Sequence, residues 1–525
     1  MEKTIIFIAV LFTAFYNLTF FTNVLQVYPL SLKNAAFFAS IAAVLTCVFI
    51  VLLSLVCYRQ TLKPVVIPLL LITSLSAYFM DSYHVIIDDG MIQNIVMTDT
   101  NEAMDLLTVR LILYFLFLGV TPAVLIQRIS LKKRSVKSAV VARLKLLVPA
   151  LAITATLIVT LGSHYASFIR EHKSLRYYTN PTGYIYAAVK YVNALTKIEQ
   201  GPIKPIAEDA RIPASDMERE LLIFVLGETA RADRFSLNGY GRETNPLLKR
   251  ENIINFGNFW SCGTSTAVSV PCMFSIYEHD DYSDSKARSL ENILDVLKRS
   301  GVSLLWRDNN SSSKGVALRV PYESYKSADV NPICDIECRD EGMLDGLQEF
   351  IDKHPTGDIF IVLHQMGNHG PAYYKRYPPL FEKFTPVCKT NQLEECSKQE
   401  IDNTYDNAIL YTDYFLSKVI AFLKSNDGRF ETGLFYVSDH GESLGEGGLY
   451  LHGLPYALSP ETQRHVPAIM WFGANNDDVD VSALQRVAGN KYSHDNLFHT
   501  ILGLLEVDSG VYRKELDINQ ISKQR

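Results

Sequence analysis

The chain has 525 residues, of which 48% are hydrophobic and 20% are charged, and its mean hydropathy lies just above zero. A chain of this length corresponds to about three domains of roughly 150 residues each. The average hides a division, because residues 1–163 have a net charge of +5 whereas residues 164–525 have a net charge of −11. This composition excludes an intrinsically disordered chain, a small disulfide-rich scaffold and a basic nucleic-acid-binding protein.

Five apolar segments lie within the first 163 residues. Each is close to the roughly 20 residues that a helix needs to cross a bilayer, and hydrocarbon offers the backbone no other way to pair. Buried core helices are a weaker alternative, because the sequence between the segments offers too little polar surface to cover them. The expected spans are 4–28, 35–58, 65–85, 108–127 and 144–162.

Charged loops predict the orientation of these spans. Residues 128–145 hold seven Lys and Arg and no acid, as expected of a cytoplasmic loop, whereas residues 81–105 hold six acids and no Lys or Arg. The N-terminus is therefore expected in the cytoplasm, and residues 163–525 are expected outside. The first segment lacks a basic leader and a small-residue cleavage site, so we expect an uncleaved anchor.

Six of the eight cysteines fall in the part expected outside, where they form three close pairs. An even number of cysteines suits an oxidising compartment. Spacing alone does not decide which cysteines pair. A zinc site is the weaker alternative, since no pair has the C-x₂-C spacing and no histidine follows at finger distance.

Residues 164–220 form a mixed connector between the two parts. Four tyrosines beside basic residues favour a position along the membrane surface, with ordinary packing as an equal alternative. Prolines and a glycine then indicate an extended linker. These residues are Tyr177, Tyr178, Tyr184 and Tyr186, followed by Gly201-Pro202, Pro205 and Pro213.

From Leu221 onward, short apolar runs alternate with amphipathic helical patterns such as 289–298 and 403–423. This alternation predicts an α/β domain with a mainly parallel sheet and helices on both faces. The predicted strands are Leu221–Leu226, Val302–Trp306, Ile359–Leu363, Leu434–Val437 and Val466–Phe472.

Metal-capable side chains directly follow two of these strands. Glu228 comes after the first, and Asp439-His440 comes after the fourth. Ligands of open α/β sheets sit at the carboxyl ends of strands, and Glu, Asp and His all suit zinc. Glu228 alone would be a weak signal, but the three residues together favour a metal site.

Residues 261–275 contain a candidate nucleophile, because a small polar run from Cys262 to Thr266 precedes an apolar, helix-compatible stretch. Hydroxyl groups at a helix start are usually caps. A helix N-terminus also stabilises an anion, however, and a nearby metal would activate a hydroxyl.

Other polar residues are candidates for phosphate or head-group contacts. His369 and His452 adjoin glycine-rich turns and could hold a second metal or a phosphate oxygen. Lys314 is a candidate phosphate contact, with a solvated lysine as the alternative. The acidic loop at 81–105 contains three polar residues with the spacing of one stripe on a helix, namely Asn94, Thr98 and Glu102. Such a stripe suits either an amine-bearing lipid head-group or solvent.

Several long motifs in order resemble bacterial phosphoethanolamine transferases, most closely the lipid A enzymes that include the mobilised colistin-resistance group. The resemblance covers the whole chain. It rests on GETARAD from Gly227, SCGTSTAVSVPCMFS from Ser261, WRDNN from Trp306, HQMGNHGPAYYKRY from His364 and SDHGESLGE from Ser438.

The resemblance implies an α-helical five-span membrane domain at 1–163, bridging helices and a linker at 164–220, and a periplasmic catalytic domain at 221–525. The last would be an α/β domain of the alkaline-phosphatase/sulfatase type. The protein would be a multi-pass monomer of the bacterial inner membrane, with its N-terminus in the cytoplasm.

The motifs also imply roles by position. Thr266 matches the nucleophile of the family, and the catalytic zinc ligands are matched by Glu228, Thr266, Asp439 and His440. Positions used around the phosphate, the head-group, further zinc or the lipid are matched by Asn310, Ser311, Lys314, His369, His452, Asn94, Thr98 and Glu102. The disulfides of the colistin-resistance group are matched by the pairs Cys262 and Cys272, Cys334 and Cys338, and Cys388 and Cys396.

The implied activity is a zinc-dependent transfer of phosphoethanolamine from phosphatidylethanolamine to a phosphate of lipid A, through a phosphoethanolamine-threonine intermediate. The added amine would lower negative surface charge and give resistance to polymyxin and colistin. Alternatives are transfer to a lipopolysaccharide core sugar, a periplasmic glucan or a protein, a teichoic-acid-type polymerase, a related hydrolase, and a non-catalytic membrane lipid sensor. The formylglycine route of sulfatases is closed to Thr266.

Overall fold

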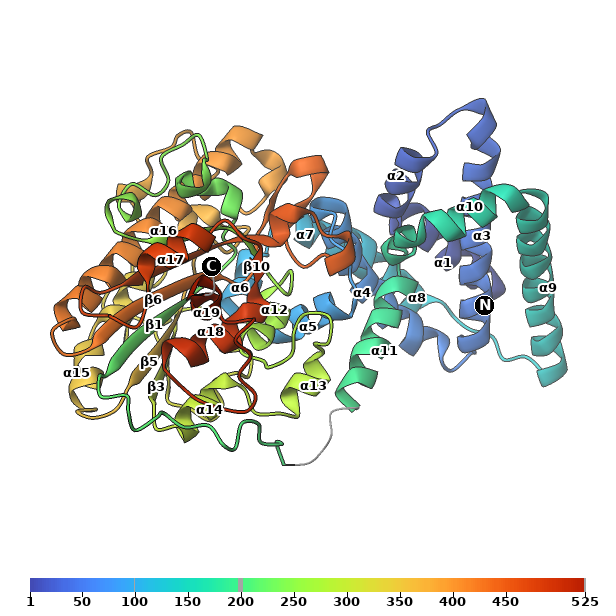
Figure 1. The fold of residues 1–525 in the computed structure, drawn as a ribbon. Coiled ribbons are helices and arrows are strands. Elements are labelled where there is room, and N and C mark those ends of the chain that lie inside the picture. The colour runs from blue at the N-terminus through green and yellow to red at the C-terminus, as the bar shows by residue number, and fades with distance from the viewer. Residues whose placement is uncertain (99, 197–201, 524–525) are drawn as a thin grey trace. The chain divides into compact units, whose positions relative to one another are not determined.

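The computed structural model describes residues 1–98, 100–196 and 202–523, which form two compact units (Figure 1). The helical unit comprises Met1–Ile92 and Leu107–Tyr191, and the α/β unit comprises Gln93–Leu106 and Val192–Arg525. Gln93–Leu106, from the acidic loop predicted at 81–105, therefore belongs to the α/β unit, although the spans on either side of this loop belong to the helical unit.

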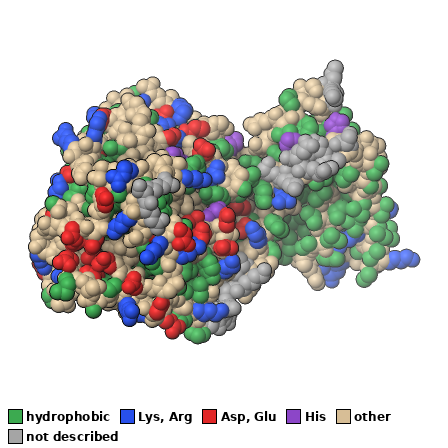
Figure 2. All heavy atoms as spheres, viewed as in Figure 1, with side chains coloured by type: hydrophobic (Ala, Val, Ile, Leu, Met, Phe, Trp, Pro, Cys, Tyr) green, Lys and Arg blue, Asp and Glu red, His purple; other side chains and the backbone are tan. Residues whose placement is uncertain are grey.

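Four helical stretches of the helical unit are long and apolar enough to cross a membrane. Hydrophobic side chains cover much of the face of this unit in Figure 2. The fifth expected span, 4–28, consists of two helices that meet at an angle of 55°. The helices are α1 (Glu2–Phe15), α2 (Leu18–Val27), α3 (Leu32–Val56), α4 (Leu62–Tyr83), the run of α7 (Val109–Tyr114), a π-helix (Phe115–Val120) and α8 (Thr121–Arg128), and α9 (Val136–Thr160).

The bend between α1 and α2 has a polar cause. Asn17 is buried between the two helices, and its amide donates to the carbonyl oxygens of Phe12 at 2.9 Å and Asn180 at 2.7 Å. Its side-chain oxygen accepts the backbone N–H of Asn180 at 2.8 Å. A side chain that enters the hydrogen-bond ladder in this way interrupts a helix. Apolar length alone could not reveal this break.

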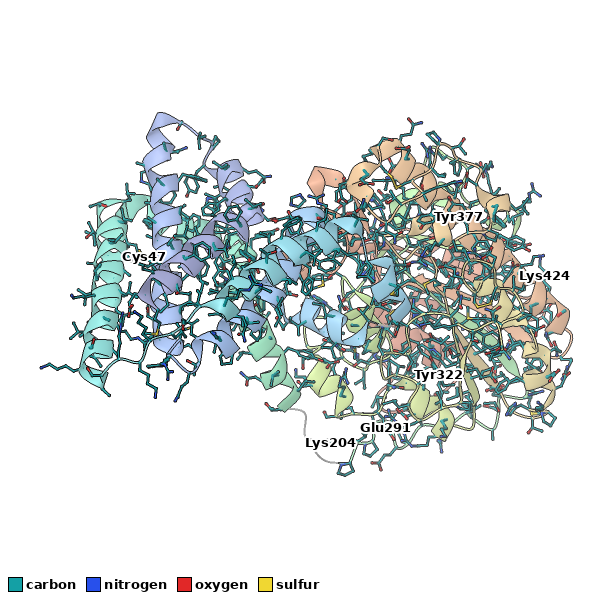
Figure 3. All side chains as sticks on the ribbon, turned by 180° about the vertical axis from the view of Figure 1, so that it is seen from behind. Cys47, Lys204, Glu291, Tyr322, Tyr377 and Lys424 are labelled. Carbon is teal, nitrogen blue, oxygen red and sulfur yellow. A yellow bond between two sulfur atoms is a disulfide. The ribbon has the colours of Figure 1, made fainter. Side chains whose placement is uncertain are left out.

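The connector begins within the helical unit. It continues from α10 (Gly162–Glu171) into a 3₁₀ turn (Lys173–Tyr178) and α11 (Thr182–Thr196). Gly201 of the expected linker lies outside the described residues. Beyond it, Lys204 and Leu290 form an isolated parallel bridge, and the N–H of Glu291 donates to the carbonyl oxygen of Lys204 at 3.0 Å (Figure 3). This bridge ties the chain before the first strand to the α/β unit.

An eight-stranded sheet forms the centre of the α/β unit, in the order β10-β2-β9-β6-β1-β5-β3-β4 (Figure 1). β9 is antiparallel to both of its neighbours, and the other neighbouring strands are parallel. The five predicted strands are confirmed as β1, β3, β5, β6 and β9. The bounds are β1 (Glu220–Gly227), β2 (Ile254–Trp260), β3 (Ser303–Asp308), β4 (Tyr322–Ser324), β5 (Ile359–His364), β6 (Glu431–Ser438), β9 (His465–Phe472) and β10 (Tyr492–Ser493).

Helices cover both faces of this sheet, as the mainly parallel arrangement requires. Alternate side chains of β1 enter two different apolar cores, one shared with α16 and the other with α12, α14 and α18. The helices predicted at 289–298 and 403–423 are α14 and α16. The main helices are α12 (Thr266–Met273), α14 (Ile293–Arg299), α15 (Leu347–Asp352), α16 (Lys398–Asn426), α17 (Val481–Val487), α18 (Leu497–Leu504) and α19 (Ile518–Lys523).

Phe224 of β1 is expected to be a major source of stability. Its fully buried ring contacts the rings of Phe274, Phe360 and Phe435, with centroids 5.6–6.4 Å away. Phe224→Ala should therefore lower the free energy of unfolding by about 3–5 kcal/mol. Guanidinium unfolding of the purified protein in detergent, followed by tryptophan fluorescence, measures the change.

Leu380 provides the matched control, because it is 90% exposed. Leu380→Ala should change the free energy of unfolding by no more than about 0.5 kcal/mol. An equally small change for Phe224→Ala would contradict the central place of the Phe224 ring.

Candidate active site

The predicted functional side chains gather at the carboxyl edge of the sheet. Glu228 directly follows β1, and Asp439 and His440 directly follow the neighbouring parallel strand β6. Thr266 is the first residue of α12. Open α/β sheets bind their ligands at this edge.

Four side chains form the centre of the site, and all four are buried. The hydroxyl of Thr266 donates to the carboxylate of Glu228, at 3.2 Å from Oε1 and 3.1 Å from Oε2, and lies 3.3 Å from Nε2 of His440. The same nitrogen is 3.3 Å from Oε1 of Glu228 and 3.4 Å from Oδ2 of Asp439. One ligand atom from each of the two carboxylates and the imidazole therefore lies within 4.8 Å of the others.

This donor set fits a divalent metal ion. Oδ1 of Asp439 accepts the backbone N–H groups of Thr229 at 3.1 Å and His440 at 2.7 Å, whereas its buried Oδ2 has no hydrogen-bond partner. Nδ1 of His440 lies 2.8 Å from the carbonyl oxygen of Gly441, so that Nε2 faces the carboxylates. A backbone bond of this kind orients a metal-binding histidine.

The two carboxylates and His440 shift one another's pKa values. Burial and the charge of Glu228 raise the pKa of Asp439. Burial opposes the charged form of His440, but the charges of Asp439 and Glu228 outweigh it and raise the pKa of the ring. Burial likewise opposes ionisation of Glu228, yet His440 holds the pKa of that carboxyl well below its usual value. A protonated His440 thus balances the negative charge that a metal would otherwise balance.

A second set of predicted residues adjoins Glu228. Nδ2 of Asn310 donates to Oε2 of Glu228 at 2.8 Å, and the N–H of Ser311 donates to Oδ1 of Asn310 at 2.5 Å. Lys314 donates to the hydroxyl of Ser311. Burial raises the pKa of Glu102, and the charge of Lys314 and a hydrogen bond with Ser311 oppose that rise. The structure therefore brings Asn310, Ser311, Lys314 and Glu102 together beside Glu228.

His369 and His452 also lie at the site. The ring centroid of His452 is 4.3 Å from that of His440 and 5.4 Å from that of His369. Burial lowers the pKa of His369 to about 3, so its ring is neutral. Nδ1 of His452 lies 3.2 Å from Oε1 of Glu442, a buried carboxylate to which the sequence analysis gave no role.

The prediction of one helical stripe through Asn94, Thr98 and Glu102 is wrong. α5 (Asp89–Met97) ends before Thr98, and Glu102 lies on a separate short helix, α6 (Thr100–Asp105). The hydroxyl of Thr98 donates back to the carbonyl oxygen of Asn94 at 2.7 Å, and such local bonds compete with helix continuation. Asn94 and Thr98 thus bond to one another, while Glu102 interacts with Ser311 and Lys314.

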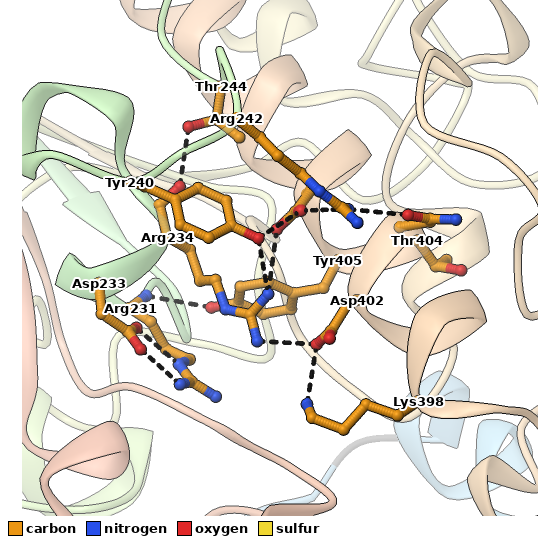
Figure 4. A network of polar contacts seen from close by, with 12 residues as sticks. Arg231, Asp233, Arg234, Tyr240, Arg242, Thr244, Lys398, Asp402, Thr404 and Tyr405 are labelled. Atoms are coloured by element: carbon orange, nitrogen blue, oxygen red, sulfur yellow. Dashed lines mark hydrogen bonds and ion pairs between the residues drawn. The ribbon is translucent and has the colours of Figure 1, made fainter.

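Buried and partly buried polar contacts hold the loop that carries Glu228 (Figure 4). Arg231 donates to both oxygens of Asp233, at 2.9 and 2.6 Å. The hydroxyl of Tyr405, on α16, accepts the N–H of Arg231 at 3.0 Å and donates to the carbonyl oxygen of Thr229 at 2.6 Å. Three further pairs join the same loop to α16, namely Arg234 with Asp402 at 2.7 Å, Arg242 with Asp406 at 2.7 Å and Tyr240 with Asp406 at 2.8 Å.

Asp340 supports the site from another side and had no recognisable signal in the sequence. Its fully buried carboxylate accepts Nδ2 of Asn309 at 2.8 Å and the backbone N–H groups of Met366 at 2.8 Å and Gly367 at 3.1 Å. It therefore ties the loop after β3 to the loop after β5. An acid in an irregular segment belongs to no strand-end pattern, so only the folded chain reveals it.

Disulfides join the three close cysteine pairs of the α/β unit. They are Cys262–Cys272, Cys334–Cys338 and Cys388–Cys396. The first of these encloses the segment that carries Thr266. Cys47 and Cys57 of the helical unit are free and buried, and Cys47 is labelled in Figure 3.

Comparison with known proteins gives matches for both units. Residues 45–195 match the family model described as phosphoethanolamine transferase EptA/EptB, and residues 220–507 match the sulfatase family model. Phosphatidylethanolamine transferase Mcr-1 from Escherichia coli is 44% identical over 513 residues, which cover 95% of this chain and 94% of that protein. Phosphoethanolamine transferase EptA from Escherichia coli (strain K12) is 40% identical over 531 residues, covering 98% and 96%.

A solved structure agrees with these relatives. The integral membrane protein lipooligosaccharide phosphoethanolamine transferase A (EptA) from Neisseria meningitidis matches with a TM-score of 0.95 at 34% identity, covering 99% of this chain and 98% of that one. Similarity of this extent, in both the helical and the α/β units, establishes the family. The chain belongs to the phosphoethanolamine transferases, as a membrane protein whose α/β unit has the sulfatase fold.

Proposed function

We propose that the protein transfers phosphoethanolamine from phosphatidylethanolamine to a phosphate of lipid A, by way of a phosphoethanolamine group on Thr266. The observation that carries this proposal is the position of the Thr266 hydroxyl. It lies at the start of a helix, within 3.3 Å of both Glu228 and His440. A relative named phosphatidylethanolamine transferase supports the choice of donor, and a relative named Kdo(2)-lipid A phosphoethanolamine 7''-transferase supports an acceptor of the lipid A class.

We assign one zinc ion to Glu228, Thr266, Asp439 and His440, whose oxygen and nitrogen donors suit that metal. When bound, zinc would lower the cost of the threonine alkoxide and balance charge on the phosphoryl oxygens. His369 and His452 are placed to hold a further zinc ion or a phosphate oxygen. Each can offer a ring nitrogen, because His369 is neutral and His452 already bonds to Glu442 through Nδ1.

The chemistry divides into two displacements at phosphorus. In the first, Glu228 accepts the hydroxyl proton of Thr266, the threonine oxygen bonds to phosphorus as the bond to the diacylglycerol oxygen breaks, and that oxygen takes up the proton as diacylglycerol leaves. In the second, a phosphate oxygen of lipid A attacks the same phosphorus, the bond to Thr266 breaks, and the threonine oxygen takes up a proton, which restores its hydroxyl. We assign the ammonium of Lys314 to a phosphoryl oxygen and the carboxylate of Glu102 to the amine of the head-group, because both side chains lie beside Ser311 near Glu228.

The membrane assignment completes the proposal. We place a membrane domain at 1–163, a bridge at 164–220 and a periplasmic catalytic domain at 221–525, in a monomer of the bacterial inner membrane with its N-terminus in the cytoplasm. Asn94 and Thr98 are assigned to the lipid donor. Adding a cationic amine to lipid A would weaken its attraction for polycations such as polymyxin and colistin.

Replacing the Thr266 hydroxyl tests the proposed nucleophile. Thr266→Ala should lower transfer by at least about 10³-fold, because it removes the hydroxyl that lies within reach of both Glu228 and His440, whereas Thr266→Ser should retain part of the activity. Mass spectrometry of lipid A from cells expressing each variant measures the transfer. The same spectra, together with those of core sugars, glucans and proteins, identify the acceptor.

Thr264→Ala is the matched control, because Thr264 donates to the carbonyl oxygen of Leu454 instead and should leave transfer largely intact. Normal lipid A modification by Thr266→Ala would refute the nucleophile assignment. Modification of a different acceptor by the unaltered protein would refute lipid A while leaving the threonine chemistry in place.

Removing the Tyr405 hydroxyl tests how the metal ligands are held. Tyr405→Phe loses the bonds to Arg231 and Thr229 that hold the loop beside Glu228, and should weaken zinc binding about tenfold. Competition of the purified protein against a chromophoric chelator measures the affinity.

Tyr414→Phe on the same helix is the control, because the Tyr414 ring packs against Phe381 and Tyr411, away from this loop. It should leave the zinc affinity unchanged. An equal affinity in Tyr405→Phe and the unaltered protein would show that the loop needs no support from α16.

A further inference from the structure

Seven carboxylates gather at the amino edge of the central sheet, at the opposite end of β1 from Glu228. Glu220 is the first residue of β1 and faces Glu431, the first residue of β6, while Asp358 directly precedes β5. Eight strand residues at about 3.3 Å each place Glu220 roughly 26 Å from Glu228. Acidic side chains gather where these strands begin in Figure 2. The amino-edge carboxylates are Asp216, Glu220, Asp358, Glu431, Asp477, Asp478 and Glu506.

The amino-edge carboxylates form three overlapping groups. Within each group, one oxygen from each residue lies within 4.8 Å of the others. Glu220 belongs to two of the groups and Asp478 to two, so the seven side chains form one continuous set. The groups are Asp216 with Glu220 and Asp358, Glu220 with Asp478 and Glu506, and Glu431 with Asp477 and Asp478.

Several buried oxygens of this set receive no hydrogen bond from an N–H or hydroxyl group of the described residues. Glu220 is 3% exposed, and the only interaction of this kind at its carboxylate is with another acid of the set, Asp358. Oδ2 of Asp358 and Oε2 of Glu431 are also buried and receive no hydrogen bond from the described N–H and hydroxyl groups. Their other oxygens accept backbone N–H groups, from Glu220 at 3.1 Å and from Asp477 at 3.5 Å. A buried carboxylate without a donor or a positive charge is costly, so these oxygens point to a missing positive partner.

The charge of Arg219 acts on Asp358 and Glu220, and that of Lys523 acts on Glu506, but neither side chain forms an ion pair with these acids. Among the described residues, no Lys, Arg or His forms an ion pair with any of the seven. Arg219 is close, but its guanidinium donates to the carbonyl oxygens of Gly357 and His354 at 2.6–2.9 Å. Burial and neighbouring acids raise the pKa of Glu220, Glu431 and Glu506. Without a cation, the set therefore keeps protons that ordinary carboxyls lose.

We propose that the amino-edge carboxylates bind a hard divalent cation, Ca²⁺, with Glu220 as the central ligand. The donors are all carboxylate oxygens, with no histidine or cysteine, and such a set selects Ca²⁺ or Mg²⁺ over zinc. Overlapping groups of carboxylates can supply one ion with a variable number of oxygens, which suits the six to eight oxygens of Ca²⁺ better than the strict octahedron of Mg²⁺. Asp477 is exposed and Asp478 is half-buried, so the ion can enter from solvent.

Such an ion would join segments that are distant in the sequence. The ligands come from the starts of β1 and β6, the residue before β5, the segment after β9 and the turn after α18. Binding would therefore stabilise the folded α/β unit and would release protons from the raised carboxyls. The reacting groups at the other end of β1 take no part in it.

The test uses the full chain purified in detergent, treated with EGTA, exchanged into buffer without chelator and then loaded with zinc. This protein is titrated with CaCl₂, while bound calcium and the thermal midpoint are measured. We expect one Ca²⁺ per chain with a Kd below about 1 mM, and a rise in Tm of about 2–4 °C at saturation. Titration in two buffers of different ionisation enthalpy should show protons released on binding.

Two variants distinguish the site from general charge effects. Glu220→Gln should lose calcium binding and the Tm rise, and its Tm without calcium should equal or exceed that of the unaltered protein, because repulsion is relieved. Asp478→Asn, at a half-buried position, should weaken calcium binding at least tenfold. The control Glu349→Gln removes an acid that is 79% exposed and should keep the full calcium response.

Other outcomes would overturn the proposal. Calcium-independent stability in the unaltered protein, with Tm rising as the pH is lowered, would show a set of acids that only share protons. A full calcium response in Glu220→Gln would place the ion elsewhere. A response to MgCl₂ without one to CaCl₂ would exclude the assignment of Ca²⁺.

Discussion

The α/β unit must compensate the free-energy cost of burying two carboxylates side by side, those of Glu228 and Asp439. Each would cost several kcal/mol in a dry site without hydrogen bonds or a positive charge. The fold supplies part of the compensation, because backbone N–H groups bind Asp439 and the Asn310 amide binds Glu228. His440 and Thr266 complete the group of side chains around the two carboxylates. A cation bound among these four side chains would offset the repulsion between the carboxylates, and its charge would favour an alkoxide on Thr266.

The sheet explains why this pair can persist. β1 and β6 are parallel neighbours with every residue buried, so their ends have little freedom to move apart. The loop after β1 is then held to α16 through the Tyr405 hydroxyl and the arginine pairs of Figure 4. Apolar packing thus sets the positions of the strand ends, and buried polar bonds orient the side chains that follow. The helical unit adds apolar helices that can lie in a bilayer, where both proposed substrates keep their acyl chains.

The strands and the central ligands could be predicted because each has a local signal. A buried parallel strand is a continuous apolar run, and the residue after it marks the ligand edge. β2, β4 and β10 were missed, since β2 mixes apolar and polar residues and the other two are very short. The break at Asn17 and the end of α5 before Thr98 depend on individual side-chain bonds that periodicity does not record. Asp340 binds the backbone of Met366, which is distant in the sequence, and Glu442 contacts His452 without belonging to a recognised pattern. The contacts of both acids are therefore visible only in the folded chain.

The two ends of β1 carry the same chemical group in different surroundings. At the carboxyl edge, loops bring amides, an imidazole and backbone N–H groups to the acids. At the amino edge, Glu220 and Glu431 face each other across neighbouring strands, where like charges destabilise a sheet. A leucine at either position would fit the buried pattern of the strand and would avoid that cost. The physical case for carboxylates there therefore depends on a positive partner with which they form no ion pair among the described side chains, and overlapping groups of carboxylate oxygens are the donors that a calcium ion prefers.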